Sequence, residues 1–499
     1  MMKNQKGITL IALVVTIVVL IILATVSINV VIGEGGIIQR AEKAKEVQAN
    51  AVVKEEEDLE SLLGQLESAL DDVVGEPKLD TTTATTMTPV KWNGSNWVKT
   101  TADDEEWYNY RGKQWANVVL GDATFNGDGT LNEDEDYTQL VWIPRYAYKI
   151  TSQYHTKGNT AGSIDIVFID TENKDKNGKE YTRDSASEYP TATVGGGMAD
   201  YVVHPAFDYG DKKLEGFWVG KYESSNTSCT TDEATGNVAY TGSEVMTVKA
   251  NVTSWRNISI GNAYAACIGM NASSNVYGLN TSDSVVDPHL TKNSEWGAIA
   301  YLSKSKYGKN TEEVWNNSNS SYITGMAGTG VNANNQATGT TFAYNTTNGQ
   351  KASTTGNIYG VYDMSGGNWE RVAAYITNGH PNLGTYGGDL VAEGTPTQHR
   401  DVYTSTVSDG SNAQAADYEQ STPANGHYGD AIWETSSSAS DPYTQSWYSD
   451  YSYFPHSNIP FFTRGGARSS TSLGGVFAFG WDVGNSYANS GFRVVVPVL

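Results

Sequence analysis

Cysteine is scarce in this sequence of 499 residues. The two that occur, Cys229 and Cys267, have neither C-x-x-C nor zinc-site spacing. In an oxidising compartment they could pair; the alternative is two separate buried thiols. Charge is also scarce and one-sided, because 33 basic residues face 56 acidic ones for a net charge of −23. No basic stripe offsets this charge, so nucleic acid is excluded as a partner.

Long apolar runs are absent except near the N-terminus, where no charge occurs from Gly7 to Gly33. An apolar run of that length spans a bilayer as a helix. Lys3 and Lys6 precede the run, which keeps that end cytoplasmic and places the bulk of the chain outside. We therefore expect a membrane helix at residues 8–33 and a cell-surface location for the rest.

The stretch "KNQKGITLIALVVTIVVL" resembles the class III signal of type IV prepilins. The resemblance implies a leader at residues 1–7, cleavage between Gly7 and Ile8 by a prepilin peptidase, and contacts with other pilin-like subunits. Ala12 stands where that family usually has a Glu, so filament assembly does not follow from the resemblance. A plain signal anchor is the alternative.

Apolar residues recur at helical spacing behind this run, as Leu59, Leu62, Leu63, Leu66 and Leu70, with acidic residues between them. They predict a helical stalk at residues 34–74. The alternative is an amphipathic helix lying on its own globular domain. A Thr-rich linker is expected at residues 75–90.

From about residue 91 the sequence predicts an α+β fold with many irregular loops. Short runs rich in Tyr, Trp, Val and Ile alternate with turn residues, and both "LVWIPRYAYKI" (140–150) and "GFWVGKYE" (216–223) read as strands. Helices are expected from Gly261 and from Thr291, the second capped by Asn293 or Ser294.

Six motifs in one order resemble the formylglycine-generating-enzyme (sulfatase-modifying factor) family: "GFWVGKYE", "VTSWRNISIGNAYAAC", "HLTKNSEWGAIAYLS", "NIYGVYDMSGGNWERVAAY", "RGGA" and "SGFRVV". The resemblance implies a variant of the C-type lectin fold at residues 216–499, with residues 91–215 as its N-terminal part or an elaboration of it.

The family's catalysis is not expected here. Its enzymes hold copper through a cysteine pair shortly after "RGG", but here Ala467, Arg468, Ser469 and Ser470 follow, with no later cysteine. Related sulfoxide synthases bind iron through clustered histidines, whereas the seven histidines of this chain are dispersed along the sequence and read as solvated loop residues.

No cofactor is firmly predicted, and Ca²⁺ is a candidate at two places. In "DMSGGNWERV" the oxygen ligand that the family usually supplies falls on Gly367, so one ligand is lost. In "TFNGDGTLNEDE" an EF-type loop would place Asn126, Asp128 and Glu135 at ligand positions, although Thr124 replaces the first Asp. An acidic surface loop is the alternative.

The C-terminal part of the chain, residues 429–499, resembles the variable proteins that retroelements diversify, which share the lectin-type fold. The resemblance implies a variable region at 464–493, with rigid apolar ends and a middle that no core pattern explains. Tyr, Trp and small polar residues suit a recognition surface. The candidate binding residues are Ala467, Arg468, Ser469, Leu473, Gly480, Trp481, Asp482, Val483, Ser486, Tyr487, Ala488 and Ser490.

The sequence thus predicts a membrane-anchored, non-catalytic protein or glycan binder, such as an adhesin, with the candidate residues on its surface rather than in its core. Two alternatives remain: a minor pilin with a structural lectin-type head, and a sulfatase-modifying-type oxidoreductase.

Overall fold

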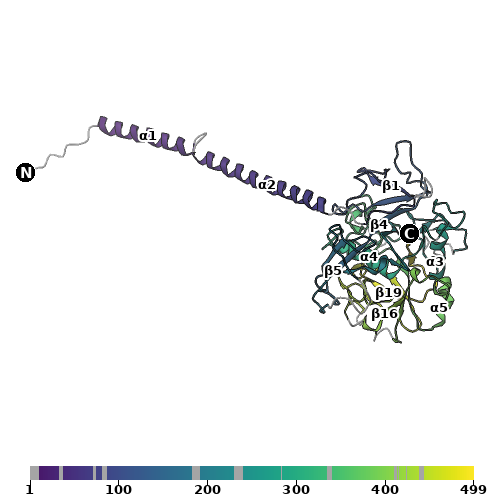
Figure 1. Cartoon of the computed structure of the whole chain (residues 1–499). Coiled ribbons are helices and arrows are strands. Elements are labelled where there is room, and N and C mark those ends of the chain that lie inside the picture. The colour runs from purple at the N-terminus through teal and green to yellow at the C-terminus, as the bar shows by residue number, and fades with distance from the viewer. Residues whose placement is uncertain are drawn as a thin grey trace, which may run out of the picture. The chain divides into compact units, whose positions relative to one another are not determined.

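The chain divides into two units, 1–72 and 73–499, in the computed structural model (Figure 1). The structure describes residues 10–32, 37–70, 75–80, 87–182, 192–229, 240–282, 284–333, 340–408, 413, 415–422, 424–437 and 443–499. The leader and the processing site at Gly7 and Ile8 lie outside these residues.

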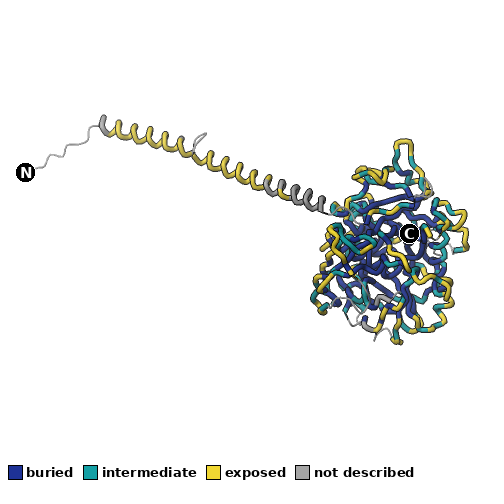
Figure 2. Tube along the Cα trace, in the orientation of Figure 1, coloured by how far each residue is buried: buried dark blue, intermediate teal, exposed yellow. Residues whose placement is uncertain are grey.

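The first unit holds two helices, α1 (Leu10–Ile32) and α2 (Ile37–Leu70), and the helical spacing of the leucines predicted a helix where α2 lies. The side chains of α1 that the structure describes are exposed, although nearly all of them are apolar; Leu20 is 59% exposed (Figure 2). A search of the described residues finds no helix with the length and apolarity to cross a membrane.

The second unit is α+β and mostly sheet, which confirms the predicted fold class at this level. Its first large sheet has the strand order β13-β21-β10-β4-β3-β1-β2, with antiparallel neighbours. The strands are β1 (Met87–Trp92), β2 (Trp97–Lys99), β3 (Asn117–Leu120), β4 (Gln139–Pro144), β10 (Gly216–Gly220), β13 (His289–Leu290) and β21 (Val494–Val496). The last strand therefore lies inside the sheet, between β10 and β13.

The second large sheet has the order β17-β16-β15-β14-β18-β19, and β20 pairs with β14 as well. Its strands are β14 (Trp369–Ile376), β15 (Asp401–Thr404), β16 (Glu419–Thr422), β17 (Ala424–Gly426), β18 (Phe461–Arg464), β19 (Phe479–Asp482) and β20 (Ser490–Phe492). β14 runs parallel to β15 and β20 but antiparallel to β18. The C-terminal segment thus joins this sheet, because β18 and β20 pair with β14 and β19 pairs with β18.

Smaller sheets and helices complete the unit. The small sheets contain β5 (Tyr146–Ile150), β6 (Ile164–Phe168), β7 (Val202–Val203), β8 (Asp208–Tyr209), β9 (Lys212–Lys213), β11 (Ser225–Asn226) and β12 (Met246–Thr247). The α-helices are α3 (Ile260–Ile268), α4 (Asn293–Lys304) and α5 (Pro381–Tyr386). Short 3₁₀ helices lie at Pro205–Phe207, Gly269–Asn271, Gly349–Ala352, Gly388–Val391, Thr397–His399, Ala415–Asp417 and Thr471–Leu473.

The helices predicted from Gly261 and Thr291 are confirmed as α3 and α4, but the cap of α4 differs from the prediction. Neither Asn293 nor Ser294 is the N-cap, because both already belong to the helix. The cap residue is Lys292, whose backbone N–H donates to the Glu295 carboxylate at 2.9 Å. A glutamate reaching back in this way satisfies one of the free donors of a helix start.

The run at 140–150 forms two strands in different sheets rather than one. The chain turns at Arg145, whose fully buried guanidinium donates to the Phe207 carbonyl at 2.9 Å and to Asn173 Oδ1 at 2.6 Å. Pro144 supplies no backbone donor at this point. The strand at Gly216–Gly220 forms as predicted.

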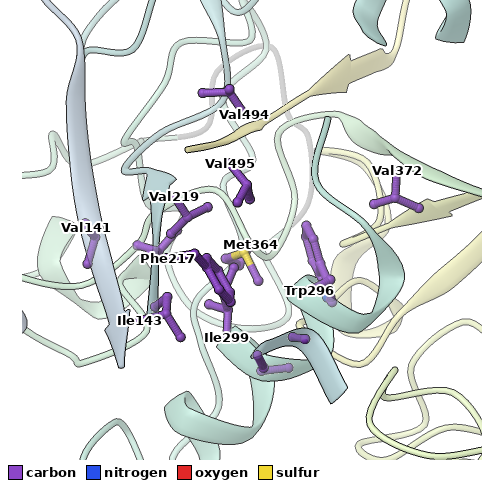
Figure 3. Close-up of a cluster of buried hydrophobic side chains, with 14 of the residues drawn as sticks. Val141, Ile143, Phe217, Val219, Trp296, Ile299, Met364, Val372, Val494 and Val495 are labelled. Carbon is purple, nitrogen blue, oxygen red and sulfur yellow. The ribbon is translucent and has the colours of Figure 1, made fainter. Parts of the chain in front are cut away.

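The core packs the first large sheet against α4, and Figure 3 shows its centre. Phe217 and Val219 of β10, Ile299 of α4 and Val495 of β21 gather there, all fully buried. Burying each such side chain stabilises the fold by roughly 1.5–3 kcal/mol. The two stretches expected as separate parts of the domain, 91–215 and 216–499, share this core, because β4 of the first pairs with β10 of the second along its length.

The stretch expected to be a linker, 75–90, partly belongs to the domain. Met87 to Val90 lie in β1, and Val90 is fully buried. Upstream, Trp142 Nε1 donates to the Gly75 carbonyl at 3.0 Å and Trp218 Nε1 donates to the Lys78 carbonyl at 2.7 Å. Two core tryptophans thus hold the chain where it enters the domain.

Candidate ligand-binding site

The C-terminal segment is held by strand pairs that place its middle at one end of the second large sheet. β19 pairs with β18, so that Trp481 lies opposite Phe462 and Asp482 opposite Phe461. β20 pairs with the start of β14, which sets Ser490 beside Trp369. Phe477, Phe479 and Phe492 are fully buried. Phe492, at the end of the segment, is therefore core, and so are Phe477 and Phe479 of "GGVFAF" in its middle, whose alternation is typical of a buried strand.

Trp481 belongs to a cluster of half-buried rings at this end of the sheet. It lies edge-on to Tyr453, with ring centroids 4.7 Å apart, and to Tyr443 at 5.3 Å. Tyr451 continues the cluster at 4.9 Å from Tyr453 and 5.9 Å from Trp369. Tyr487 is 57% exposed, and no other aromatic side chain that the structure describes is as open to solvent.

A hollow of about 570 Å³ adjoins these rings, and we call it the aromatic pocket. Its volume suits a small ligand. The lining residues are Trp369, Tyr453, Ile459, Thr463, Gly480, Trp481, Asp482, Val483, Asn485, Tyr487, Asn489 and Ser490. Six of the twelve candidate residues line it: Gly480, Trp481, Asp482, Val483, Tyr487 and Ser490.

Asp482 is bound into the fold rather than free on the surface. Its carboxylate accepts from Arg371 Nη1 at 2.7 Å and also from the backbone N–H of Gly484. Arg371 is fully buried in β14, and its other terminal nitrogen donates to the Asn485 carbonyl. The pair thus fastens the 482–485 turn to the sheet beneath the pocket.

Gly480 and Ser490 also differ from the expected surface positions, since both are buried. A Cβ at residue 480 would come within 2.7 Å of Thr463 Oγ1 and 3.0 Å of the Trp369 ring. A side chain at this point requires the tryptophan to move. Gly480 therefore helps to set the depth of the pocket.

The other candidate residues lie in the loop after β18 and in the turn before β20. In the loop, Ala467 is buried, Arg468 and Leu473 are half-buried and Ser469 is exposed; in the turn, Ser486 is exposed and Ala488 half-buried. Tyr322 connects the two groups. The guanidinium carbons of Arg468 and Arg256 lie 4.7 and 4.4 Å from its ring centroid. Arg256 also donates to the Ala488 carbonyl at 2.9 Å.

The two cysteines are free thiols and do not form a disulfide. Burial raises the pKa of Cys229 to about 11 and raises that of Cys267 further above its usual value. Thiols of this kind are poor nucleophiles and poor metal ligands near neutral pH. Neither lies in the segment after Gly466 where the enzyme family has its pair.

The prediction that the histidines are solvated was wrong for several of them. His155, His204, His289 and His399 are buried, and the rings of the last two stack 5.2 Å apart. Each ring has a carboxylate partner at 2.8 Å, Glu295 for His289 and Asp287 for His399. Burial lowers the pKa of His399, although Asp287 opposes that shift.

Both calcium candidates stay predictions. Among the described residues, no group of three or more His, Cys, Asp or Glu side chains could hold an ion. Asn126 and Asp128 lie in one hairpin loop, where the Asp128 carboxylate accepts from the N–H and hydroxyl of Thr130. Glu135 follows this loop, and its backbone carbonyl accepts from Lys249.

In the "DMSGGNWERV" element, Gly367 and Asn368 lie against the carboxylate of Glu223, which follows β10. Glu223 accepts from the backbone N–H of Asn368 at 2.7 Å and from its amide at 2.5 Å. A Cβ at Gly367, where φ is +67°, would meet Glu223 Oε1 at 2.4 Å, so only glycine fits. Glu370 pairs with Arg493 at 2.5 Å. Burial raises the pKa of Glu223 well above its usual value.

Comparisons with known proteins add no relative: no protein-family model matches the chain, and no curated protein matches it either.

Sequence reasoning missed the third of the aromatic pocket's lining that lies outside 464–493, namely Trp369, Tyr453, Ile459 and Thr463. Trp369 comes from β14, and Tyr453 comes from "YTQSWYSDYSYF" at 443–454, which also holds its ring neighbours Tyr443 and Tyr451. The Tyr and Ser content of that stretch is typical of recognition loops and was a usable signal. The Arg371–Asp482 pair spans 111 positions and left no local pattern.

Proposed function

We propose that this chain is a surface-displayed, non-catalytic ligand-binding protein whose segment 464–493 forms a recognition surface diversified by a retroelement. The observation that carries the proposal is the contrast within this segment. Phe477, Phe479 and Phe492 are fully buried, whereas Trp481 is half-exposed beside the aromatic pocket and Tyr487 is 57% exposed. A scaffold whose buried aromatic residues stay fixed can tolerate change at the exposed positions between them.

The fold proposed for the domain is the formylglycine-generating-enzyme variant of the C-type lectin fold. The six motifs that resemble that family fall, in order, on β10, α3, β13 with α4, β14, the end of β18, and β20 with β21. All of these elements lie in one unit and share one core. This distribution supports the resemblance, because each motif supplies an element that packs on the others.

The absence of catalysis is part of the proposal. Ala467 to Ser470 take the place of the copper-binding cysteines, and Ala467 is itself buried, with its N–H donating to Ser470 Oγ at 2.9 Å. This tight loop offers no soft ligand for Cu(I).

The N-terminal segment is proposed to anchor the protein in the cell envelope. The support is the uncharged stretch from residue 7 to 33 and the exposed apolar side chains of α1. The stretch extends past the described residues at both ends. A minor pilin with a structural head remains the second candidate, favoured by the prepilin-like motif; neighbouring genes for a prepilin peptidase and an assembly ATPase would select it.

Sequencing the coding region of residues 464–493 from a population of source cells tests the proposal. We expect substitutions at codons such as those for Ser469, Trp481 and Tyr487, and none at those for Phe479 and Phe492. A second copy of this region, beside a reverse-transcriptase gene and differing only at adenines, is also expected. The control is the coding region of residues 140–170. Equal substitution frequencies in the two regions would refute diversification.

A further inference from the structure

We propose that the aromatic pocket takes a neutral saccharide, an inference that rests on the binding function proposed above and names its ligand class. The pocket combines three properties: its one charged lining residue, Asp482, is already engaged, four of its lining residues are aromatic, and the amides of Asn485 and Asn489 line it as well.

Charge excludes the common ionic ligands. Asp482 is the only Asp, Glu, Lys, Arg or His among the lining residues of the pocket. Its carboxylate is already engaged by Arg371 and by the N–H of Gly484. A phosphate or carboxylate ligand would find no cation among these residues, and an ammonium ligand would find no free carboxylate. An ionic ligand would lose its hydration without gaining a partner.

The aromatic walls fit the apolar face of a sugar ring. The rings of Trp481 and Tyr453 lie at 63° to one another, and the Tyr451 ring lies 4.9 Å from the Tyr453 ring. These contacts fix the rings before a ligand arrives, which lowers the entropy cost of binding. A pyranose presents C–H groups on one face, which pack on such a ring, and hydroxyls at its edge.

Polar groups at the edge of the pocket suit those hydroxyls. Asn485 and Asn489 line it and are half-exposed, and each amide offers both donors and an acceptor. Sugar hydroxyls likewise donate and accept. A volume of about 570 Å³ accommodates one or two sugar rings.

An extended peptide is a poorer occupant. β19 ends the second large sheet, and a peptide could add to such an edge. However, the chain at 451–453 already lies along it: the N–H of Phe479 donates to the Tyr451 carbonyl, and the N–H of Tyr453 donates to the Phe479 carbonyl, each at 3.0 Å. This part of the edge is occupied.

The pocket has a constant wall and a wall from the segment proposed to vary. Trp369 and Tyr453 lie outside 464–493, whereas Trp481 and Tyr487 lie within it. Variants would therefore keep part of the stacking surface and differ in the rest. The ligand class would stay the same while the preferred sugar changed.

Saturation-transfer NMR with maltose, cellobiose, lactose and N,N′-diacetylchitobiose tests the inference, with glucose 6-phosphate and choline as charged probes. We expect at least one neutral disaccharide to receive saturation, mainly at ring C–H protons, and the charged probes to receive none. Trp481→Ala should weaken that binding at least about tenfold, because aromatic anchors dominate recognition surfaces. Trp315→Ala, a half-buried tryptophan outside the pocket, should not weaken it.

Tyr487→Ala provides a second variant that does not depend on packing, since this side chain is exposed. The inference is overturned if no neutral disaccharide binds the folded full chain, or if binding is unchanged in both Trp481→Ala and Tyr487→Ala. Peptides selected from a random library that bind through Trp481, with no saccharide bound, would overturn the ligand class alone. The sequencing experiment would then still decide the proposed function.

Discussion

Replacing Asp482 separates the stability of the C-terminal segment from its binding role. Asp482→Ala removes the carboxylate that pairs with Arg371, whose side chain is fully buried. Breaking a buried ion pair costs about 3–5 kcal/mol, because the remaining charge stays desolvated. The Asp482 side chain is 14% exposed, so water can reach the vacated position, and we expect the lower end, about 3 kcal/mol.

For a unit as large as 73–499, an unfolding entropy of about 2.1 cal/mol/K per residue converts ~3 kcal/mol into a fall of roughly 3 °C in Tm. Differential scanning calorimetry of the purified protein measures it. Ser486→Ala is the matched control on an exposed side chain and should cost no more than about 0.5 kcal/mol. Arg371→Met combined with Asp482→Ala should melt above Asp482→Ala, since no buried charge remains unpaired. If the Tm of Asp482→Ala equals that of the Ser486→Ala control, the Arg371–Asp482 ion pair does not stabilise the fold.

The remaining predictions concern packing, pH and processing. Phe479→Ala should lower stability by about 3–5 kcal/mol, whereas Tyr487→Ala should stay within about 0.5 kcal/mol; equal melting of the two would place Tyr487 in the core. Burial raises the pKa of Glu434 from 4.5 to about 7, so the native state holds a proton that the unfolded chain releases above pH 4.5. Its contribution is therefore full below about pH 4.5 and declines up to about pH 7. Tm should fall over this window, and less so in Glu434→Gln; identical pH profiles would contradict the shift. Residues 73–499 supplied with copper and oxygen should not convert the cysteine of a sulfatase-motif peptide to formylglycine, and conversion above background would restore the enzyme alternative. Mass spectrometry of the protein from cells with a prepilin peptidase should show loss of residues 1–7. A protein that retains residues 1–7 would support the alternative of a plain signal anchor.

Features with a local period were predictable from the sequence. α3 and α4 follow from helical spacing, and β10 follows from its apolar run. The fully buried Phe479 follows from the alternation of "GGVFAF", and the fully buried Phe492 follows from the apolar end "GFRVVV". In each of these cases the signal and the structure involve the same few neighbouring residues.

Features that depend on distant contacts were not predictable. Nothing within 140–150 shows that Arg145 joins two sheets, because the partners of its side chain lie 28 to 69 positions away. Asp482 looked like a surface residue because Arg371 is remote in sequence. His289 and His399 looked like separate loop residues, although the fold stacks them. The aromatic pocket likewise needs three separate stretches of chain.

The position of β21 has a consequence for the folding of chains that end early or lose the reading frame within codons 464–493. Val494 to Val496 fill the gap between β10 and β13, so the first large sheet stays open until the ribosome has released them. A premature stop or a frameshift within codons 464–493 would deprive the sheet of an interior strand and expose its core. Such products would be removed as misfolded chains. If the segment is diversified and displayed as proposed above, only copies read in frame through Val496 would complete this sheet.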